Sequence, residues 1–173
     1  MDTNIANFIP SHFNDNSRVW IFQNPIRFND AETEEIKNIL SSFLSQWNAH
    51  GAPVKGFATV LYNKFIIIMA DEGETIVSGC STDSLERMIK QIRDKYNVDL
   101  FERLSLSFIV DGEIISIMLH EIDKHIENGT LTPDTLYFNN TVLNKIDFVE
   151  KWIIPASQSW LSKYFVEERK LAK

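Results

Sequence analysis

The chain has 173 residues, a length that fits about one domain and predicts a real hydrophobic core. Its 44% hydrophobic and 24% charged residues are typical of globular proteins and exclude a disordered, collagen-like or disulfide-rich chain. The formal net charge is −7, so the chain lacks the electrostatic attraction to phosphates that drives non-specific nucleic-acid binding. No basic stripe in the sequence offsets this charge. We therefore expect no nucleic acid as a partner.

The cysteine content and the apolar runs bear on cellular location. Cys80 is the one cysteine, so an internal disulfide and a cysteine-based metal site are excluded, which fits a reducing compartment. The first residues show no pattern of a secretion signal. The longest strongly apolar run, Phe65 to Ala70, is far shorter than the roughly 20 residues of a membrane-spanning helix. We predict a cytoplasmic protein without membrane insertion.

The N-terminal part of the chain predicts a buried strand followed by an amphipathic helix. Arg18 to Gln23 holds four consecutive apolar residues, a pattern typical of a strand buried on both faces. The helix is predicted to begin with Asp30 as its N-cap, and apolar residues follow at steps of three and four: Ile36, Ile39, Leu40, Phe43, Leu44 and Trp47. Gly51, which follows His50, is predicted to end this helix.

Two strands and a second helix are predicted next. Lys55 to Tyr62 and Lys64 to Ala70 indicate strands joined by a tight turn, and the second of them is apolar on both faces. The run Asp83-Ser84-Leu85-Glu86 predicts the start of a helix, because its Asp can accept from a backbone N–H and its Glu can reach back. The buried stripe of this helix is predicted to be Leu85, Met88, Ile89, Ile92 and Tyr96.

The last third of the chain predicts a hairpin and then helices. Asp111-Gly112 is a strong signal for a two-residue turn, so Ser105 to Val110 and Glu113 to Met118 are predicted to pair as strands. Helical segments are expected at residues 119–128, 141–152 and 156–171. Their aromatic side chains are expected to form core rather than a ligand site. These are Phe148, Trp152, Trp160, Tyr164 and Phe165.

This order of elements predicts an α+β fold: a ferredoxin-like β-α-β-β-α-β core, one added strand and C-terminal helices. Such a core puts the first and third strands in the middle of the sheet, and these are the strands that appear buried on both faces. The C-terminal helices, or a dimer partner, are expected to cover the sheet face that the two core helices leave open. We predict a single domain over residues 1–173, with the core at 18–118 and a helical extension at 119–173.

One segment has the glycine spacing of a phosphate-binding loop without its chemistry. It runs from Gly51 to Gly56, but Phe57 and Ala58 stand where Lys and Ser or Thr are required. The segment also leads into a predicted strand, whereas a phosphate loop leads into a helix whose N-terminus faces the anion. We therefore expect no ATP binding and no ATPase activity.

Polar residues from three parts of the sequence are predicted to meet at one edge of the sheet. The topology sends the end of the first helix, the end of the third strand and the start of the second helix to the same side. An imidazole, a thiol and carboxylates there can bind a ligand or a metal, support nucleophilic chemistry or form a hydrogen-bond network. The predicted site residues are His50, Asp71, Glu72, Ser78, Cys80 and Asp83.

Five segments within about residues 18–115 form a combination that is more specific than any one of them. They are Arg18-Val19-Trp20-Ile21, Trp47-Asn48-Ala49-His50-Gly51, Asp71-Glu72, Ser78-Gly79-Cys80-Ser81-Thr82-Asp83-Ser84 and Val98-Asp99-Leu100-Phe101-Glu102-Arg103. The combination resembles an uncharacterised family of small bacterial proteins whose members are often labelled ABC transporter ATPase. The resemblance implies membership of a family and no established activity, because the phosphate loop and the Gly-rich signature of such ATPases are missing from the sequence.

The leading functional interpretation is a small protein that binds a ligand or partner through this polar edge, without catalysis. One alternative is a thiol-dependent enzyme with Cys80 as nucleophile and His50 as base. Another is a structural or assembly subunit, monomeric or homodimeric, whose aromatic C-terminal helices meet a partner chain.

We predict no cofactor and no metal. His120 and His125 are five residues apart and so cannot share the helix face that a zinc site needs.

Overall fold

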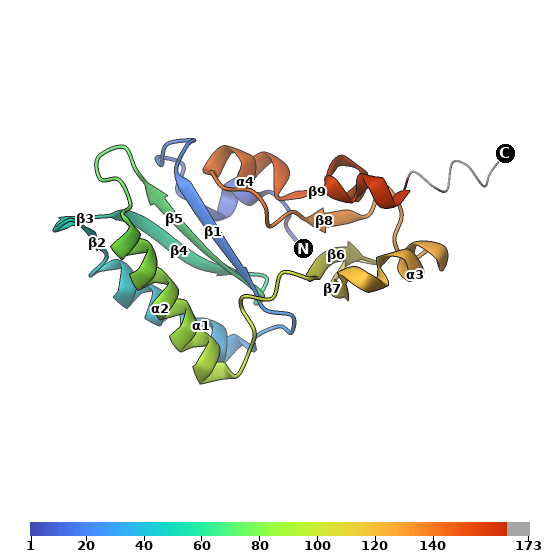
Figure 1. Ribbon diagram of the computed structural model, residues 1–173, viewed down its shortest axis with the longest axis horizontal. Helices are drawn as coiled ribbons and strands as arrows, with labels where there is room; N and C mark the ends of the chain where they lie inside the picture. Colours follow the sequence, from blue (N-terminus) through green and yellow to red (C-terminus); the bar gives the residue numbers. More distant parts are fainter. Residues whose placement is uncertain (166–173) are drawn as a thin grey trace. The chain divides into compact units, whose positions relative to one another are not determined.

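The computed structural model describes residues 1–165, which form an α+β fold with antiparallel sheets (Figure 1). By its internal contacts the chain divides into two compact units. The larger unit comprises Asn4–Glu102 and Leu143–Val149, and the smaller unit comprises Met1–Thr3, Arg103–Val142 and the described residues from Glu150 onward. The division thus falls before the predicted Ser105 to Val110 strand, whereas the sequence interpretation grouped residues 18–118 in one core.

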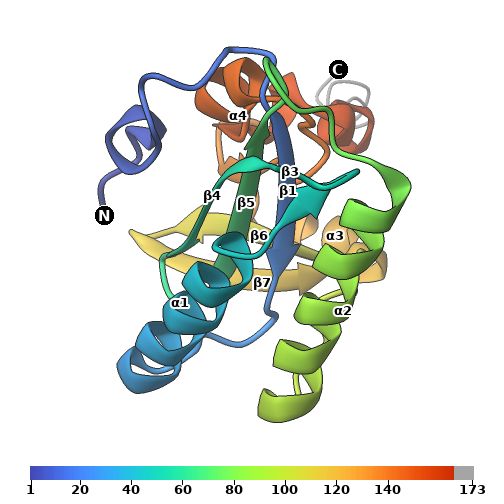
Figure 2. The ribbon, with the colours of Figure 1, turned by 90° about the vertical axis from the view of Figure 1, so that its left-hand side faces the viewer.

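The larger unit is a three-stranded antiparallel sheet with two helices side by side on one face (Figure 2). Its strand order is β1-β5-β4, and all seven residues of β5 are buried. The central position of β5 confirms that part of the prediction. The elements are η1 (Ile5–Phe8), β1 (Arg18–Gln23), α1 (Asp30–Leu44), β2 (Asn48–Ala49), β3 (Ala52–Pro53), β4 (Lys55–Leu61), β5 (Phe65–Asp71), α2 (Gly79–Tyr96) and the start of α4 (Lys145–Lys151).

A ferredoxin-like core would place the Ser105 to Val110 strand beside β1, but the structure does not. That strand, β6, pairs with β7 on one side and β8 on the other, so both of its edges are occupied. The free edge of β1 is partly covered by the chain before α4, where the Val19 amide donates to the Leu143 carbonyl at 2.9 Å. β1 is therefore an edge strand, and the described pairing supports an α+β fold without the full ferredoxin-like order.

The two faces of β5 pack against different parts of the larger unit. Ile66, Ile68 and Ala70 join the core under α1 and α2, so the alternate residues of β5 point to the opposite face. There the rings of Phe8, Tyr62 and Phe65 form a chain of edge-to-face contacts, with centroids 6.3 and 6.4 Å apart. The sequence interpretation expected only C-terminal helices or a dimer partner on this face, and it missed the N-terminal segment, which buries Ile5, Ile9 and Phe13.

A buried lysine ties α4 to that N-terminal segment. The Lys145 ammonium donates to the carbonyls of Ser11 and Phe13 at 3.1 and 2.5 Å and lies 3.7 Å from the Asp15 carboxylate. Its side chain is only 9% exposed, so these oxygens replace the water that its charge would otherwise need. Phe148, one turn further along α4, is fully buried.

Both helices of the larger unit begin earlier than the sequence predicted. The N-cap of α1 is Asn29, not Asp30, and it forms a capping box with Glu32 in which each side chain bonds the backbone N–H of the other. The N-cap of α2 is Ser78, which forms the same arrangement with Ser81, so this helix starts ahead of the predicted Asp83 signal. Neither Asn29 nor Ser78 is the N-cap that the sequence predicted.

The first helix also ends earlier than predicted. α1 stops at Leu44, and residues 48–53 form a small hairpin of β2 and β3 instead of a last helical turn. His50 and Gly51 are the two turn residues, with φ of 51° and 84°. Two consecutive positive φ angles are what a tight hairpin turn requires. Gly51 therefore serves a hairpin turn and not the end of a helix.

The smaller unit has its own four-stranded antiparallel sheet in the order β7-β6-β8-β9. The hairpin of β6 and β7 has the predicted bounds, and β8 and β9 were not predicted. Leu161 and Phe165 pack in a core with Phe108 and Tyr137 of this sheet, so they serve it rather than the first sheet. The elements are β6 (Ser105–Val110), β7 (Glu113–Met118), η2 (Leu119–Glu121), α3 (Ile122–Glu127), β8 (Leu136–Phe138), β9 (Ile153–Pro155), η3 (Ala156–Gln158) and η4 (Trp160–Phe165).

The C-terminal helices are shorter than predicted. The expected helix at 141–152 is the seven-residue α4, and the expected helix at 156–171 begins as the short turns η3 and η4. The remainder of that prediction, residues 166–171, lies outside the described residues. Trp152 is buried, and its indole N–H donates to the Asn140 side chain at 2.9 Å.

The close approach of α1 to the sheet generates the first prediction. A Cβ at Gly56 of β4 would lie 2.7 Å from Leu44 Cδ2 and 3.0 Å from Trp47 Cε3. We expect Gly56→Ala to lower the free energy of unfolding by about 1–3 kcal/mol, measured by urea denaturation. Gly79→Ala is the control, because a Cβ there meets open space at the start of α2. Equal stability of the two variants would contradict the packing argument.

A second buried lysine predicts how stability depends on pH. Lys64 is 2% exposed, and its ammonium donates to the Pro25 carbonyl at 2.6 Å. Burial, with a smaller contribution from the nearby Arg27 charge, lowers the pKa of Lys64 to about 8. Between this value and its ordinary pKa near 10.5, the unfolded chain holds the proton and the folded chain releases it. Stability from this residue therefore rises as pH increases from about 8 to 10.5.

The test compares Lys64→Met with the wild-type protein by denaturant unfolding across that pH range. The wild-type protein should gain up to about 3 kcal/mol relative to Lys64→Met between pH 7.5 and 10.5. Lys124→Met, which replaces an exposed lysine of α3, is the control and should follow the wild-type curve. Parallel curves for the wild-type protein and Lys64→Met would show that the buried ammonium carries no such penalty.

Candidate functional site

The predicted site residues lie at one end of the larger unit. The β2–β3 hairpin, the end of β5 and the first turn of α2 all reach this end (Figures 1 and 2). The base of the hairpin is tied to α2, because the buried Trp47 indole donates to the Ser81 carbonyl at 3.0 Å. His50, Asp71, Glu72, Ser78, Cys80 and Asp83 therefore share a side of the unit.

The two carboxylates at this end are engaged in local structure. Asp71 forms an ion pair with Lys55, at 2.6 Å between Nζ and Oδ2, and accepts from the Gly73 amide at 3.3 Å. The Lys55 hydrogen bond outweighs burial and holds the pKa of the Asp71 carboxyl below its usual range. Glu72 accepts from the Val77 amide at 2.9 Å and so shapes the loop that leads into α2.

The other four residues do not form a joint network. Ser78 caps α2, and its hydroxyl lies 2.6 Å from that of Ser81. Cys80 and Asp83 are exposed on the first turns of α2, and His50 is exposed at the tip of the hairpin. Within residues 1–165 the structure gives these three side chains no hydrogen bond or ion pair, and it groups no three metal-ligating side chains there.

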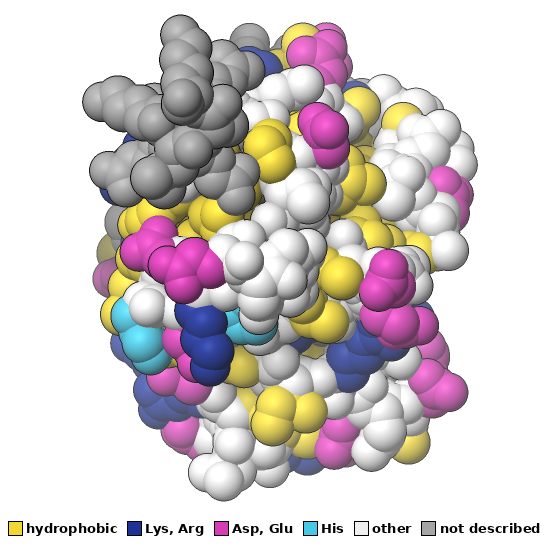
Figure 3. All heavy atoms as spheres, turned by 90° about the vertical axis from the view of Figure 1, so that its right-hand side faces the viewer, with side chains coloured by type: hydrophobic (Ala, Val, Ile, Leu, Met, Phe, Trp, Pro, Cys, Tyr) yellow, Lys and Arg dark blue, Asp and Glu magenta, His cyan; other side chains and the backbone are white. Residues whose placement is uncertain are grey.

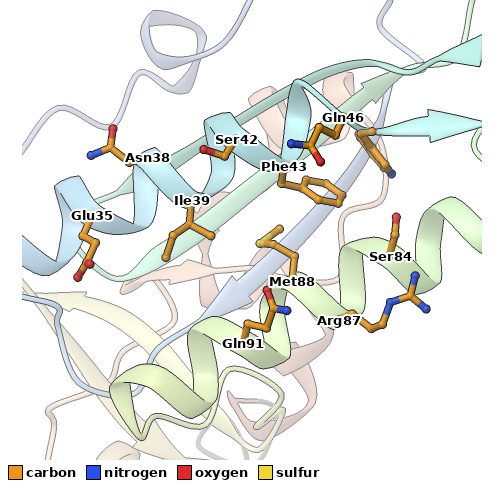
Figure 4. A pocket seen from close by; sticks show the side chains of 11 residues that line it. Glu35, Asn38, Ile39, Ser42, Phe43, Gln46, Ser84, Arg87, Met88 and Gln91 are labelled. Carbon is orange, nitrogen blue, oxygen red and sulfur yellow. The ribbon is translucent and has the colours of Figure 1, made fainter.

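Sequence reasoning missed a groove between α1 and α2. It has a volume of about 760 Å³, and Figure 4 shows its side chains converging from the two helices. The residues that line it are Glu35, Asn38, Ile39, Ser42, Phe43, Gln46 and Trp47 from α1 and the chain after it, and Ser84, Arg87, Met88 and Gln91 from α2. The groove lies beside the predicted edge, because Trp47, which lines it, also ties the base of the β2–β3 hairpin to Ser81 of α2.

The floor of the groove is apolar. Ile39 and Phe43 stand one helical turn apart and are partly buried, and Met88 faces them from α2 (Figure 4). At one end Trp47 closes the floor, with its ring centroid 5.3 Å from that of Phe43 and 6.0 Å from that of Trp20. The aromatic contacts and the indole hydrogen bond to Ser81 hold this end in place.

The opposite end of the groove is closed by a polar tie between the helices. The Glu35 carboxylate accepts from the Lys95 ammonium and, at 2.6 Å, from the Tyr96 hydroxyl. The hydrogen bond from Lys95, followed by that from Tyr96, lowers the pKa of Glu35. Burial, followed by the Glu35 hydrogen bond, raises the pKa of Tyr96. The carboxylate is thus ionised but already paired.

The walls of the groove carry amides, hydroxyls and one cation. Asn38 and Ser42 of α1 and Gln46 just after it follow one another at steps of four, and Ser84 and Gln91 line the groove from α2. Arg87 is exposed, and the described residues provide no ion pair for its guanidinium. This arrangement can supply apolar contact, neutral hydrogen bonds and one positive charge.

The apolar periodicity of the first helix contains the groove residues but does not separate them from the core. Apolar periodicity alone assigns Ile39 and Phe43 to the core stripe of the first helix, together with Ile36 and Leu40. In the structure Ile36 and Leu40 are buried, whereas Ile39 and Phe43 are only partly covered. The parallel row of Asn38, Ser42 and Gln46 was the additional signal, since uncharged polar residues at this spacing mark one face of a helix.

Comparison with family models, with curated proteins and with solved structures finds no match. The resemblance to the bacterial family therefore stays a prediction.

Among residues 1–165, no helix is both long and apolar enough to cross a membrane. On the face drawn in Figure 3, acidic, basic and apolar side chains are interspersed, with no broad patch of one charge outside the grey atoms.

Proposed function

We propose that this protein is a small cytoplasmic protein that binds a ligand or a protein partner, without ATPase activity, and that the groove between α1 and α2 is its binding site. The observation that carries the proposal is the composition of the groove: a partly uncovered apolar floor between two rows of amide and hydroxyl groups. Sites that bind organic ligands or helices combine apolar area with a few polar groups in this way.

The chemistry of the lining residues supports binding rather than catalysis. Catalysis of acyl or phosphoryl transfer needs a nucleophile with a base, or a metal site, in the same cavity. The carboxylate in the groove, Glu35, is held by Lys95 and Tyr96 at one end. The segment Gly51 to Gly56 runs through β3 into β4, so it lacks the helix that a phosphate loop requires.

Two groove variants with a matched control test this proposal. Ser42 and Ser41 are neighbouring exposed residues of α1, but only Ser42 lines the groove. Mixtures of organic acids, bases, neutral metabolites and short helical peptides are screened against the ¹⁵N-labelled protein by NMR. We expect the binding compounds to shift signals of groove residues. Ser42→Trp should reduce their affinity at least roughly tenfold by filling the groove, and Ser41→Trp should leave it unchanged.

The assignment of the groove would be wrong if the binding compounds shift NMR signals of residues outside it. It would also be wrong if these compounds bind Ser42→Trp and Ser41→Trp equally well. A Gln46→Trp variant provides a second way to fill the groove from the same wall. Retained melting temperatures for the tryptophan variants ensure that lost binding reflects a filled groove and not unfolding.

The thiol-dependent enzyme remains the second candidate, and the exposed position of Cys80 in the first turn of α2 is the observation that favours it. A catalytic pair of Cys80 and His50 predicts fast, His50-dependent alkylation. We expect instead slow alkylation by iodoacetamide at pH 7, a rate that His50→Ala leaves unchanged, and unaltered ligand binding in Cys80→Ser. Rapid alkylation that falls tenfold or more in His50→Ala would favour the enzyme.

A further inference from the structure

The occupant of the groove can be specified from its shape and charge. We infer that it is an amphipathic helix of a partner protein, at least two turns long, with an apolar stripe facing the floor and an acidic side chain at Arg87. This inference rests on the proposed function and adds the class of partner to it.

The dimensions of the groove match a helix. The lining residues of α1 extend from Glu35 to Phe43, eight residue steps or about 12 Å of helix, and Gln46 and Trp47 in the chain after α1 continue the groove. The apolar floor repeats at one-turn intervals through Ile39 and Phe43, the spacing at which a bound helix presents its own apolar residues. The two ties at the ends, from Glu35 and Trp47, set the two ends of this length.

The walls have the composition of a protein interface. Exposed charges are frequent elsewhere on these helices, where Lys37 pairs with Glu34 and Lys90 pairs with Glu86. Along the groove Glu35 and Arg87 are the charged residues, and the other exposed wall residues are Asn38, Ser42, Gln46 and Gln91. Charged residues are depleted at the centre of protein interfaces, because desolvating them is costly. The predominance of uncharged polar groups over this described surface therefore favours contact with a protein.

Arg87 determines the charge of the partner. Glu35 is paired by Lys95 and Tyr96, so the guanidinium of Arg87 is the charge of the groove without an ion pair in the described chain. Asp83, one turn earlier on α2, is close enough in sequence to pair with it but does not do so here. A carboxylate from a bound helix satisfies this guanidinium in two-pronged geometry.

The groove fits a helix better than a small molecule. Ligand pockets cover most of a small ligand's surface, whereas here the wall residues of both helices are largely exposed and the space between them is open along its length (Figure 4). A helix laid in this opening completes a three-helix arrangement and covers the partly exposed Ile39 and Phe43.

The experiment uses three synthetic 14-residue peptides and the full-length protein. One peptide is an amphipathic helix with a leucine stripe and flanking glutamates, the second replaces the glutamates with lysines, and the third is a scramble of the first. Affinity is measured by fluorescence anisotropy, and NMR follows the side-chain amides of Asn38, Gln46 and Gln91. We expect the acidic amphipathic peptide to bind at least roughly fivefold more tightly than the other two and to shift these amides.

Charge reversal provides the matched variants. Arg87→Glu should weaken the acidic peptide roughly tenfold and make the lysine peptide the tighter binder. Lys90→Glu makes the same charge change on α2 outside the groove and should leave the order of the peptides unchanged. Equal binding of the acidic and lysine peptides, or an unchanged order in Arg87→Glu, would overturn the inference.

The outcomes separate this inference from the proposed function. If no helical peptide shifts the groove signals but a small molecule from the mixtures does, the helix is wrong and the binding site stands. If neither shifts them, both proposals fail.

Discussion

The complete burial of β5 is the constraint on which the larger unit depends. All seven of its residues are buried, so both faces of the sheet need an apolar cover. One cover is the pair α1 and α2. The other includes the N-terminal segment and the start of α4, joined where the Lys145 ammonium donates to the Ser11 and Phe13 carbonyls. These carbonyls replace the hydration of that charge, so the segment that precedes β1 is tied to α4 at this point.

The groove follows from the way the helices are held on that sheet. Gly56 has no side chain, so α1 lies close against β4. The helices meet at one end through Glu35 and at the other through the Trp47 indole, which reaches the Ser81 carbonyl of α2. Between these ties the facing side chains leave an open space instead of interlocking. The groove is therefore a gap between two fixed contacts, and such a preformed gap lowers the ordering cost of binding.

At the predicted edge, the sequence pattern places the residues correctly but does not reveal their role. The order of strands and helices was sufficient to bring His50, Asp71 and Cys80 to one end. It did not reveal that Asp71 is opposite Lys55 in the register of β4 and β5, where the two side chains pair. The helix that was expected to reach Gly51 ends at Leu44, because Trp47 turns to bond α2 and the chain reverses in a hairpin at His50. Both facts depend on partners distant in sequence.

The sequence by itself determined the elements whose signals are local: the α+β class, the bounds of β1, the β6–β7 hairpin at Asp111-Gly112 and, on α2, the buried residues Leu85, Met88, Ile89 and Ile92. Apolar periodicity and turn chemistry depend on neighbouring residues, so one chain is enough to show them. Tertiary structure decided that β6 belongs to a second sheet, that the N-terminal segment covers β5, and that Ile39 and Phe43 line an open groove rather than a closed core. Strand pairing and helix spacing depend on which of several apolar surfaces meet, and that choice is made by the whole set of contacts rather than by any single segment.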